Sequence, residues 1–301
     1  MNGWILYKDS ESNIKPEAYE INKFKDVAKE NGIDLKIISP EQFDLLVTRD
    51  DRKSIRLDGD IVPLPDFLLP RMGAGTTYFA LAIIRHLEKL GVHSFNKSTG
   101  IETVKDKLYT QQILAASDLP FAKTMLVRFP INTDLVEKNL GFPIIIKTVS
   151  GSQGTGVFLA ENRINFEDLM SLIRATKVTT NIILQEFITS SRSRDLRVIT
   201  IGGRAIVAMK RIAKDGSFKA NFSHGGSVES YELSPEIEWL STEASRIFDL
   251  DIGGIDLLFD GEHFKICEVN SSPGFEGIET CHKINIAQEI FRFLRVRLGK
   301  F

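Results

Sequence analysis

The sequence predicts a protein that combines α/β and α+β units, and three observations support this. In the first 95 residues, short apolar strands alternate with amphipathic helical stretches, which is typical of an α/β unit. After residue 96 the chain becomes rich in strands joined by Gly-Gly or Asp-Gly turns, which indicates α+β structure. A chain of 301 residues is long enough for two or three subdomains with a substantial core.

The elements of the first unit follow from their apolar patterns. Strands are expected at residues 4–7, 35–38 and 67–69 with a polar hairpin near 58–60, and helices over about 17–31 and 78–90. Residues 73–77 are rich in glycine and end in two threonines, but no lysine follows them. A helix start with a threonine cap is therefore the favoured interpretation, and contact with a substrate is the alternative.

The remaining elements are assigned in the same way. Helices are expected over residues 106–116, 166–176, 236–248 and 284–298, and strands on both sides of residues 151–156 and at 182–188, 255–259 and 263–269. Turns are expected at 118–120, 202–203, 215–216 and 260–261. The last of these turns joins two apolar strands into a hairpin.

Composition excludes several classes of protein. The formal net charge is −2, so no strong basic field is available for nonspecific nucleic-acid binding. The apolar runs are too short to span a membrane and the first residues lack an apolar leader, so we expect a cytoplasmic protein. Cys267 and Cys281 lack the paired spacing of metal ligands, and Cys267 is expected to be a packing residue of an apolar strand.

A glycine-rich loop follows an apolar strand at residues 142–147. It reads Gly151, Ser152, Gln153, Gly154, Thr155, Gly156, and Val157-Phe158 after it indicate another strand. The Walker pattern and the dinucleotide pattern both require a helix after the glycines and a different glycine order, so neither fits. The loop is either an ordinary hairpin or a strand-loop-strand segment that covers phosphates.

Three oxygen-bearing side chains lie on the hairpin near the C-terminus. Glu268 and Asn270 are two positions apart on one strand, so they share a face about 7 Å apart, and the turn at 260–261 brings the strand of Asp256 alongside. Oxygen ligands on short arms suit Mg²⁺, which often completes its shell with substrate phosphates. Ion pairing of these acids with Arg or Lys of a neighbouring strand is the alternative.

Other polar residues interrupt apolar strands. Lys147 ends a run that should be buried, so it needs an anion, for which a polyphosphate is a good candidate. The segment 185–188 could hold an adenine base between apolar side chains and a few hydrogen-bonding groups. Asp195 and Arg197 alternate on one strand face, where an internal salt bridge is as well supported as a functional role. Lys107 lies early in a helix of the preceding segment.

Taken in order, these motifs resemble the ATP-grasp superfamily, and most closely the RimK-type α-L-glutamate ligases. The resemblance begins at residues 69–73, Leu-Pro-Arg-Met-Gly, which are similar to the family's Ile-Pro-Arg-Ile-Gly, and ends at residues 272–279, Ser-Pro-Gly-Phe-Glu-Gly-Ile-Glu. It therefore covers nearly the whole chain. Each motif alone is modest, whereas their order and spacing together are specific.

The resemblance implies an ATP-grasp fold with three parts: a pre-ATP-grasp α/β domain at residues 1–95, a central lid subdomain at 96–187, and a C-terminal α+β subdomain at 188–301. It implies that ATP lies between the last two parts and that residues 151–156 close over the phosphates. Asp256, Glu268 and Asn270 would hold two Mg²⁺ ions, with Glu268 bridging them and Mn²⁺ as a possible substitute. The implied nucleotide-binding residues are Lys107, Lys147, Gly151, Ser152, Gln153, Gly154, Thr155, Gly156, Gln185, Glu186, Phe187, Ile188, Asp195 and Lys219. Arg197, Arg211 and Asn221 would face the acyl-phosphate and the incoming amine.

The implied activity is an ATP-dependent carboxylate–amine ligation that adds L-glutamate to a protein tail or a small acid. Lys219 and His224 stand where ribosome-modifying relatives usually have arginine, so the substrate is the least secure implication. An amino-group carrier protein, a peptide or a coenzyme is an alternative acceptor, and a nucleotide-binding regulator without turnover is an alternative class. The relatives commonly form dimers or tetramers.

Overall fold

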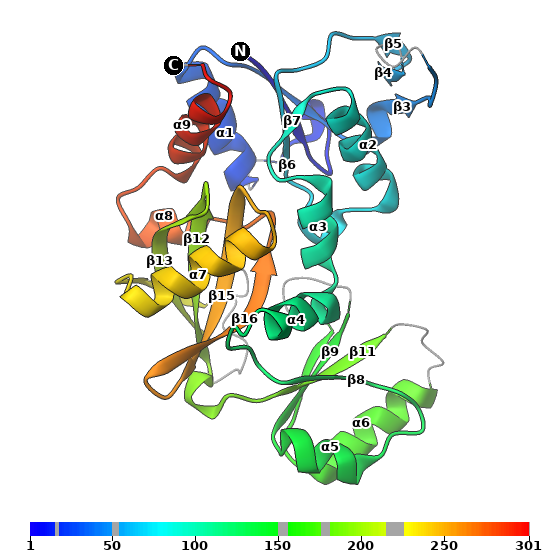
Figure 1. The fold of residues 1–301 in the computed structure, drawn as a ribbon, viewed down its shortest axis with the longest axis vertical. Coiled ribbons are helices and arrows are strands. Elements are labelled where there is room, and N and C mark those ends of the chain that lie inside the picture. The colour runs from blue at the N-terminus through cyan, green and yellow to red at the C-terminus, as the bar shows by residue number, and fades with distance from the viewer. Residues whose placement is uncertain (16–17, 50–53, 150–155, 176–180, 215–225, 301) are drawn as a thin grey trace.

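The computed structural model describes residues 1–15, 18–49, 54–149, 156–175, 181–214 and 226–300. Figure 1 shows the first unit at one end of the molecule, the central unit at the other, and the five-stranded sheet between them. Besides the α-helices and strands given below, the described residues contain four short 3-10 helices: η1 (Glu11–Asn13), η2 (Pro40–Gln42), η4 (Gly73–Gly75) and η5 (Thr189–Ser191). No helix of the described residues is both long and apolar enough to cross a bilayer.

The first unit contains a four-stranded parallel sheet of order β2-β1-β6-β7. Its elements are β1 (Asn2–Leu6), α1 (Tyr19–Glu30), β2 (Asp34–Ile38), β6 (Phe67–Pro70), α2 (Tyr78–Lys89) and β7 (His93–Ser94). A small antiparallel sheet of β3 (Phe43–Leu45), β4 (Ile55–Leu57) and β5 (Asp60–Ile61) accompanies it. The expected α/β pattern is confirmed, because every strand and helix predicted here has its counterpart.

The central unit is an antiparallel sheet of order β10-β9-β11-β8, covered by two helices. It comprises β8 (Thr124–Leu126), α5 (Thr133–Leu140), β9 (Ile144–Thr148), β10 (Val157–Ala160), α6 (Arg163–Ala175) and β11 (Ile182–Glu186). Sequence patterns did not predict α5. Its signals were present, since Asn132 caps its first turn and Gly141 ends it at a φ of 70°.

The third unit is a five-stranded antiparallel sheet of order β14-β13-β12-β15-β16. Its strands are β12 (Arg194–Ile201), β13 (Arg204–Ile212), β14 (Ser227–Tyr231), β15 (Ile252–Asp260) and β16 (His263–Asn270). The associated helices are α3 (Ser98–Lys105), α4 (Lys107–Ala116), α7 (Pro235–Ile247), α8 (Glu276–Cys281) and α9 (Ile286–Arg297), of which α3 and α8 were not predicted. The predicted turns at 202–203 and 260–261 are confirmed, whereas 215–216 lies outside the described residues.

The first and third units share one hydrophobic core. The ring of Phe24 on α1 packs edge-on against Phe275 and against Phe291 on α9, with centroids 5.6 and 5.8 Å apart. The Asn96 side chain donates to the carbonyl oxygens of Ile252 and Ser271, which adds a polar tie between the two units. The central unit instead packs around a separate cluster of its own sheet and helices. The central unit therefore has a hydrophobic core of its own.

The threonine cap predicted for the second helix is present, because Thr77 Oγ1 accepts a hydrogen bond from the Ala80 backbone amide at 3.1 Å. Replacing Thr77 with alanine is expected to lower the free energy of unfolding by about 1 kcal/mol, since one amide of the first turn loses its acceptor. Urea denaturation would measure the change. Thr77→Ser keeps the hydroxyl and should change stability by less than half as much; equal losses for both variants would contradict the capping role.

Candidate active site

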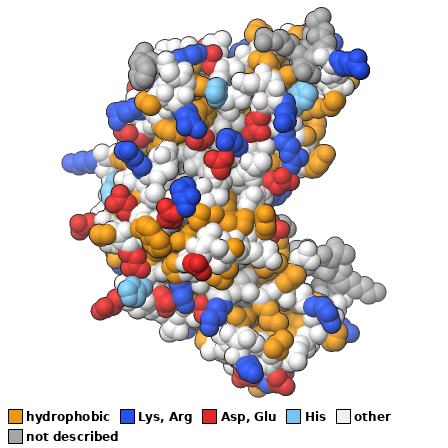
Figure 2. Space-filling model, viewed as in Figure 1, with side chains coloured by type: hydrophobic (Ala, Val, Ile, Leu, Met, Phe, Trp, Pro, Cys, Tyr) orange, Lys and Arg blue, Asp and Glu red, His pale blue; other side chains and the backbone are white. Residues whose placement is uncertain are grey.

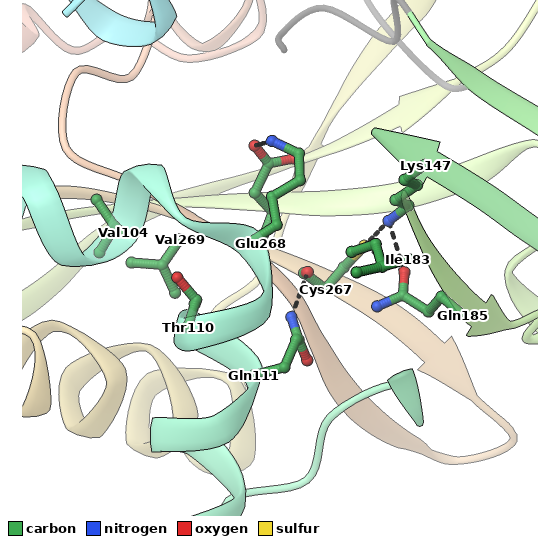
Figure 3. A pocket seen from close by; sticks show the side chains of 10 residues that line it. Val104, Thr110, Gln111, Lys147, Ile183, Gln185, Cys267, Glu268 and Val269 are labelled. Atoms are coloured by element: carbon green, nitrogen blue, oxygen red, sulfur yellow. Dashed lines mark hydrogen bonds and ion pairs between the residues drawn. The ribbon is translucent and has the colours of Figure 1, made fainter. Parts of the chain in front are cut away.

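A pocket lies where α4, the central sheet and β16 meet (Figure 3). Lys147 and Gln185 approach it from the central sheet, and Gln111 approaches from α4 on the other side. The residues that line it are Val104, Lys107, Thr110, Gln111, Lys147, Ile183, Gln185, Cys267, Glu268 and Val269. Four of these were predicted site residues and come from segments up to 161 positions apart: Lys107, Lys147, Gln185 and Glu268.

Lys147 points into this pocket from β9. Its Nζ donates to Gln185 Oε1 at 2.5 Å and lies 3.6 Å from Cys267 Sγ. The three residues before it are buried, as the sequence indicated, so the ammonium group is placed at the end of an apolar strand. The pocket therefore presents a cation beside an amide, a pair of groups that can bind an anion and the edge of a ring.

Cys267 also lines the pocket, which sequence reasoning did not predict. The register of β15 and β16 pairs Asp256 with Glu268 and Leu257 with Ile266, so Cys267 is the extra residue of a bulge. A bulge changes the direction of a side chain, which strict alternation cannot anticipate. Burial raises the pKa of the Cys267 thiol, although nearby Lys147 opposes this, so the thiol is neutral at physiological pH.

The three predicted metal ligands lie on one hairpin, as expected. Asp256 is directly opposite Glu268 and Asn270 is opposite Gly254 in the antiparallel register. Glu268 is partly exposed and its Oε1 lies 3.4 Å from Lys107 Nζ. Asn270 Nδ2 is buried without a hydrogen-bond partner. The oxygen and nitrogen atoms of an amide side chain are told apart by their hydrogen-bond partners. In the opposite orientation of the Asn270 amide, its oxygen would take the place of this nitrogen.

Asp256 belongs to a buried network of four charges. Arg197 donates to it through Nε at 2.7 Å and Nη2 at 2.6 Å, and Arg211 Nη2 lies 3.0 Å from its Oδ2. Arg211 also donates twice to Asp195, at 2.6 and 2.8 Å. Burial alone would raise the pKa of Asp256, but the two guanidinium groups hold it below its ordinary value. The alternative that this acid pairs with an arginine of a neighbouring strand is therefore confirmed for Arg197 on β12, and Arg211 on β13 also contacts the acid.

The donor set still fits a hard divalent cation. Within the described ranges, no three His, Cys, Asp or Glu side chains are arranged to hold a metal. The candidate set consists of two carboxylates and one amide, which are oxygen donors of the kind that Mg²⁺ prefers when substrate and water complete its shell. Glu268 and the unpaired amide of Asn270 are available for this, and Asp256 becomes available where a guanidinium releases it.

The side chains of residues 185–188, the segment predicted to hold adenine, do not all face the pocket. Gln185 faces the pocket, whereas the Glu186 carboxylate accepts from the Lys123 backbone amide at 2.8 Å and pairs with Lys265 at 3.1 Å. Phe187 lies 5.9 Å from the Arg192 guanidinium, and Ile188 is buried. The side chain of Glu186 therefore ties β11 to β16, which leaves backbone groups of this segment as the ones able to contact a base.

The glycine-rich loop connects two paired strands. Lys147 is opposite Val157, and the Thr148 amide donates to the Gly156 carbonyl at 3.1 Å. Gly156 has a φ of 73°, and a Cβ there would lie 2.8 Å from Thr148 Oγ1, so only glycine fits. The two flanking strands are therefore confirmed, and the covering of phosphates by this loop stays a prediction. Gly151, Ser152, Gln153, Gly154 and Thr155 lie outside the described residues, as do Lys219, Asn221 and His224.

Two protein-family models match the sequence of this chain. Residues 104–294 match the model of the RimK-like ATP-grasp domain, and residues 13–101 match that of the RimK PreATP-grasp domain. The chain belongs to the RimK-like ATP-grasp family. The resemblance inferred from its motifs is thus confirmed.

Relatives and solved structures agree with this assignment. A Legionella pneumophila protein named probable alpha-L-glutamate ligase is 36% identical over 281 residues, which cover 93% of this chain and 92% of the relative. The crystal structure of a RimK domain protein ATP-grasp from Sphaerobacter thermophilus has a TM-score of 0.75 at 15% identity and covers 97% and 99% of the two chains. The ATP-grasp ligase PsnB, complexed with its minimal precursor, Mg and ADP, has a TM-score of 0.73 at 15% identity and covers 99% and 98%. This RimK-like protein is an ATP-dependent ligase with the ATP-grasp fold and an N-terminal pre-ATP-grasp domain.

Proposed function

We propose that this RimK-like ligase adds L-glutamate to the carboxylate of a protein C-terminus or a small acid, through an acyl-phosphate intermediate. The observation that carries the proposal is its similarity, over 93% of the chain, to a protein named probable alpha-L-glutamate ligase. The pocket chemistry supports it, because Lys147, Lys107 and Glu268 converge where a nucleotide phosphate would meet a hard cation.

In this proposal Gln185 and the backbone of residues 186–188 hold the adenine, and Lys107 and Lys147 hold the phosphates. Asp256, Glu268 and Asn270 would bind Mg²⁺, as two ions or with Mn²⁺ in its place, and the metal would neutralise charge on the transferred phosphoryl group. The nucleotide side of the cleft further includes Asp195 and Lys219. The limits of the three subdomains, 1–95, 96–187 and 188–301, form part of the same proposal.

The chemistry requires an ordered and dry site. A carboxylate attacks the γ-phosphorus of ATP and displaces ADP, and the amine of glutamate then displaces phosphate from the acyl carbon and loses a proton, which forms the amide. Arg197, Arg211 and Asn221 are assigned to the acyl-phosphate and the amine, because guanidinium and amide donors stabilise developing negative charge. Residues 151–156 would exclude water, which would otherwise hydrolyse the intermediate. A cytoplasmic dimer or tetramer is the proposed state of the enzyme.

Amine-dependent ADP release tests this function. With ATP, Mg²⁺ and candidate acceptors, L-glutamate is expected to accelerate ADP formation, while L-aspartate and L-lysine serve as matched controls. Mass spectrometry of cell extract incubated with ATP and labelled glutamate would identify the acceptor, including a carrier protein, a peptide or a coenzyme. ADP formation that is the same with every amine and acceptor would contradict ligase activity, and nucleotide binding with no turnover would indicate a regulator.

A further inference from the structure

The carboxylate of Asp256, a proposed metal ligand, already pairs with two cations of the protein itself. Three N–H groups from Arg197 and Arg211 approach its two oxygens within 3.0 Å, and its side chain is 7% exposed. A carboxylate offers about four lone-pair sites, so little capacity remains for a further ligand. The same oxygens cannot serve both guanidinium groups fully and a cation.

The charges around the site also disfavour a bare cation. Among the described residues, the carboxylates of Asp195, Asp256 and Glu268 lie with four cationic side chains: Arg197, Arg211, Lys107 and Lys147. A divalent ion alone would add positive charge to a partly buried site in which cations outnumber carboxylates. Repulsion between charges a few ångströms apart is strong where solvent is excluded. A polyphosphate would reverse this balance and supply ligands for the ion.

The two arginines are held differently. Arg211 makes two hydrogen bonds to Asp195 besides its contact with Asp256, and its side chain is 6% exposed. Arg197 is 17% exposed, and in the described part of the chain Asp256 is the only hydrogen-bond partner of its side chain. Arg197 is therefore the guanidinium that can leave at lower cost, and its planar fork matches a phosphate as well as a carboxylate.

We propose that Arg197 takes the place of the metal at Asp256 in the nucleotide-free protein, so that a divalent cation binds stably only together with the nucleotide. Arg197 then turns from Asp256 toward the phosphates. The inference rests on the proposed function, since it takes Asp256 as a metal ligand. It adds an order of binding and a positioning role for Arg197 before any chemistry occurs.

Mn²⁺ binding to the full chain tests this order without measuring activity. Electron paramagnetic resonance distinguishes bound from free Mn²⁺, and a sample of Mn²⁺ and ADP without protein corrects for their own complex. The unsubstituted protein is expected to bind Mn²⁺ at least about tenfold more tightly with ADP than without it. Arg197→Met should raise the affinity without ADP by about tenfold, because it removes the competing cation.

Two further variants control the experiment. Arg204 is an exposed arginine on β13, so Arg204→Met makes the same change of net charge and should leave Mn²⁺ affinity unchanged. Arg197→Lys keeps the charge but loses the fork, so its Mn²⁺ affinity without ADP is expected to exceed that of the unsubstituted protein and to stay below that of Arg197→Met. If the methionine variant does not fold, the rise relative to the unsubstituted protein is the test. Tight Mn²⁺ binding by the unsubstituted protein without ADP would overturn the inference, as would unchanged affinity in both Arg197 variants. Absence of Mn²⁺ binding even with ADP would instead overturn the metal assignment within the proposed function.

Discussion

Replacement of Asp256 with alanine is expected to lower the free energy of unfolding by about 3–5 kcal/mol, a loss typical of breaking a buried ion pair on one side. The reason is that, among the described residues, Arg197 would lose the carboxylate that its side chain bonds, and Arg211 would keep only its pair with Asp195. Ligase turnover should be lost as well, since the proposed metal site loses a ligand. Urea denaturation followed by circular dichroism measures the first effect, and ADP release measures the second.

Glu268→Gln is the matched comparison for this variant. Its carboxylate is partly exposed and lies 3.4 Å from Lys107, so the pair contributes no more than about 1 kcal/mol. We therefore expect Glu268→Gln to lose turnover while keeping nearly all of the stability. A stable Asp256→Ala protein would contradict the importance of the buried network, and full turnover in either variant would contradict the metal assignment.

The stability contributed by Asp256 should also depend on pH in a defined direction. Its pKa is lower in the folded protein than its ordinary value of 3.8, so its contribution is fully present above that value. It is lost as pH falls through the folded pKa. The difference in stability between the unsubstituted protein and Asp256→Ala should therefore be constant near neutral pH and shrink below about pH 3.8.

Replacement of Lys147 with alanine is the second large effect expected, with a loss of roughly 2–4 kcal/mol of transition-state stabilisation, by analogy with other electrostatic donors. This corresponds to a fall of about 30- to 1,000-fold in kcat/KM. The physical reason is that its ammonium group lies at the pocket beside Gln185, where it can contact phosphate. Steady-state kinetics with ATP as the varied substrate would measure the change.

The control for Lys147 is an exposed lysine of the same unit. Lys138 lies on α5 and points to solvent, so Lys138→Ala removes an equal charge and should leave kcat/KM within about twofold. Unchanged kinetics in Lys147→Ala would show that this lysine does not face the reacting phosphates. A fall caused only by unfolding would appear as a matching loss in thermal or urea stability.

The sequence by itself determined the elements whose signals are local. Alternation along residues 263–269 and the turn at 260–261 placed the strand of Asp256 alongside that of Glu268, and Val157-Phe158 after the glycine-rich loop indicated a second strand. These predictions succeed because side-chain alternation and turn geometry depend on neighbouring residues. Helices α3, α5 and α8 were missed, since short segments of eight, eight and six residues give weak periodic signals.

Tertiary structure alone decided which groups meet at the site. Pairing of β12 with β13 and β15 brought Arg197 and Arg211 to Asp256, and packing of α4 on β16 brought Lys107 to Glu268 across 161 positions. The ion pair that directs the Glu186 carboxylate to Lys265 likewise joins strands distant in the sequence, whereas the bulge at Cys267 interrupts the alternation within one hairpin. Local patterns predicted chemical groups on the right strands, but the partner that neutralises each charge is fixed by non-local packing, because electrostatic pairing acts through space.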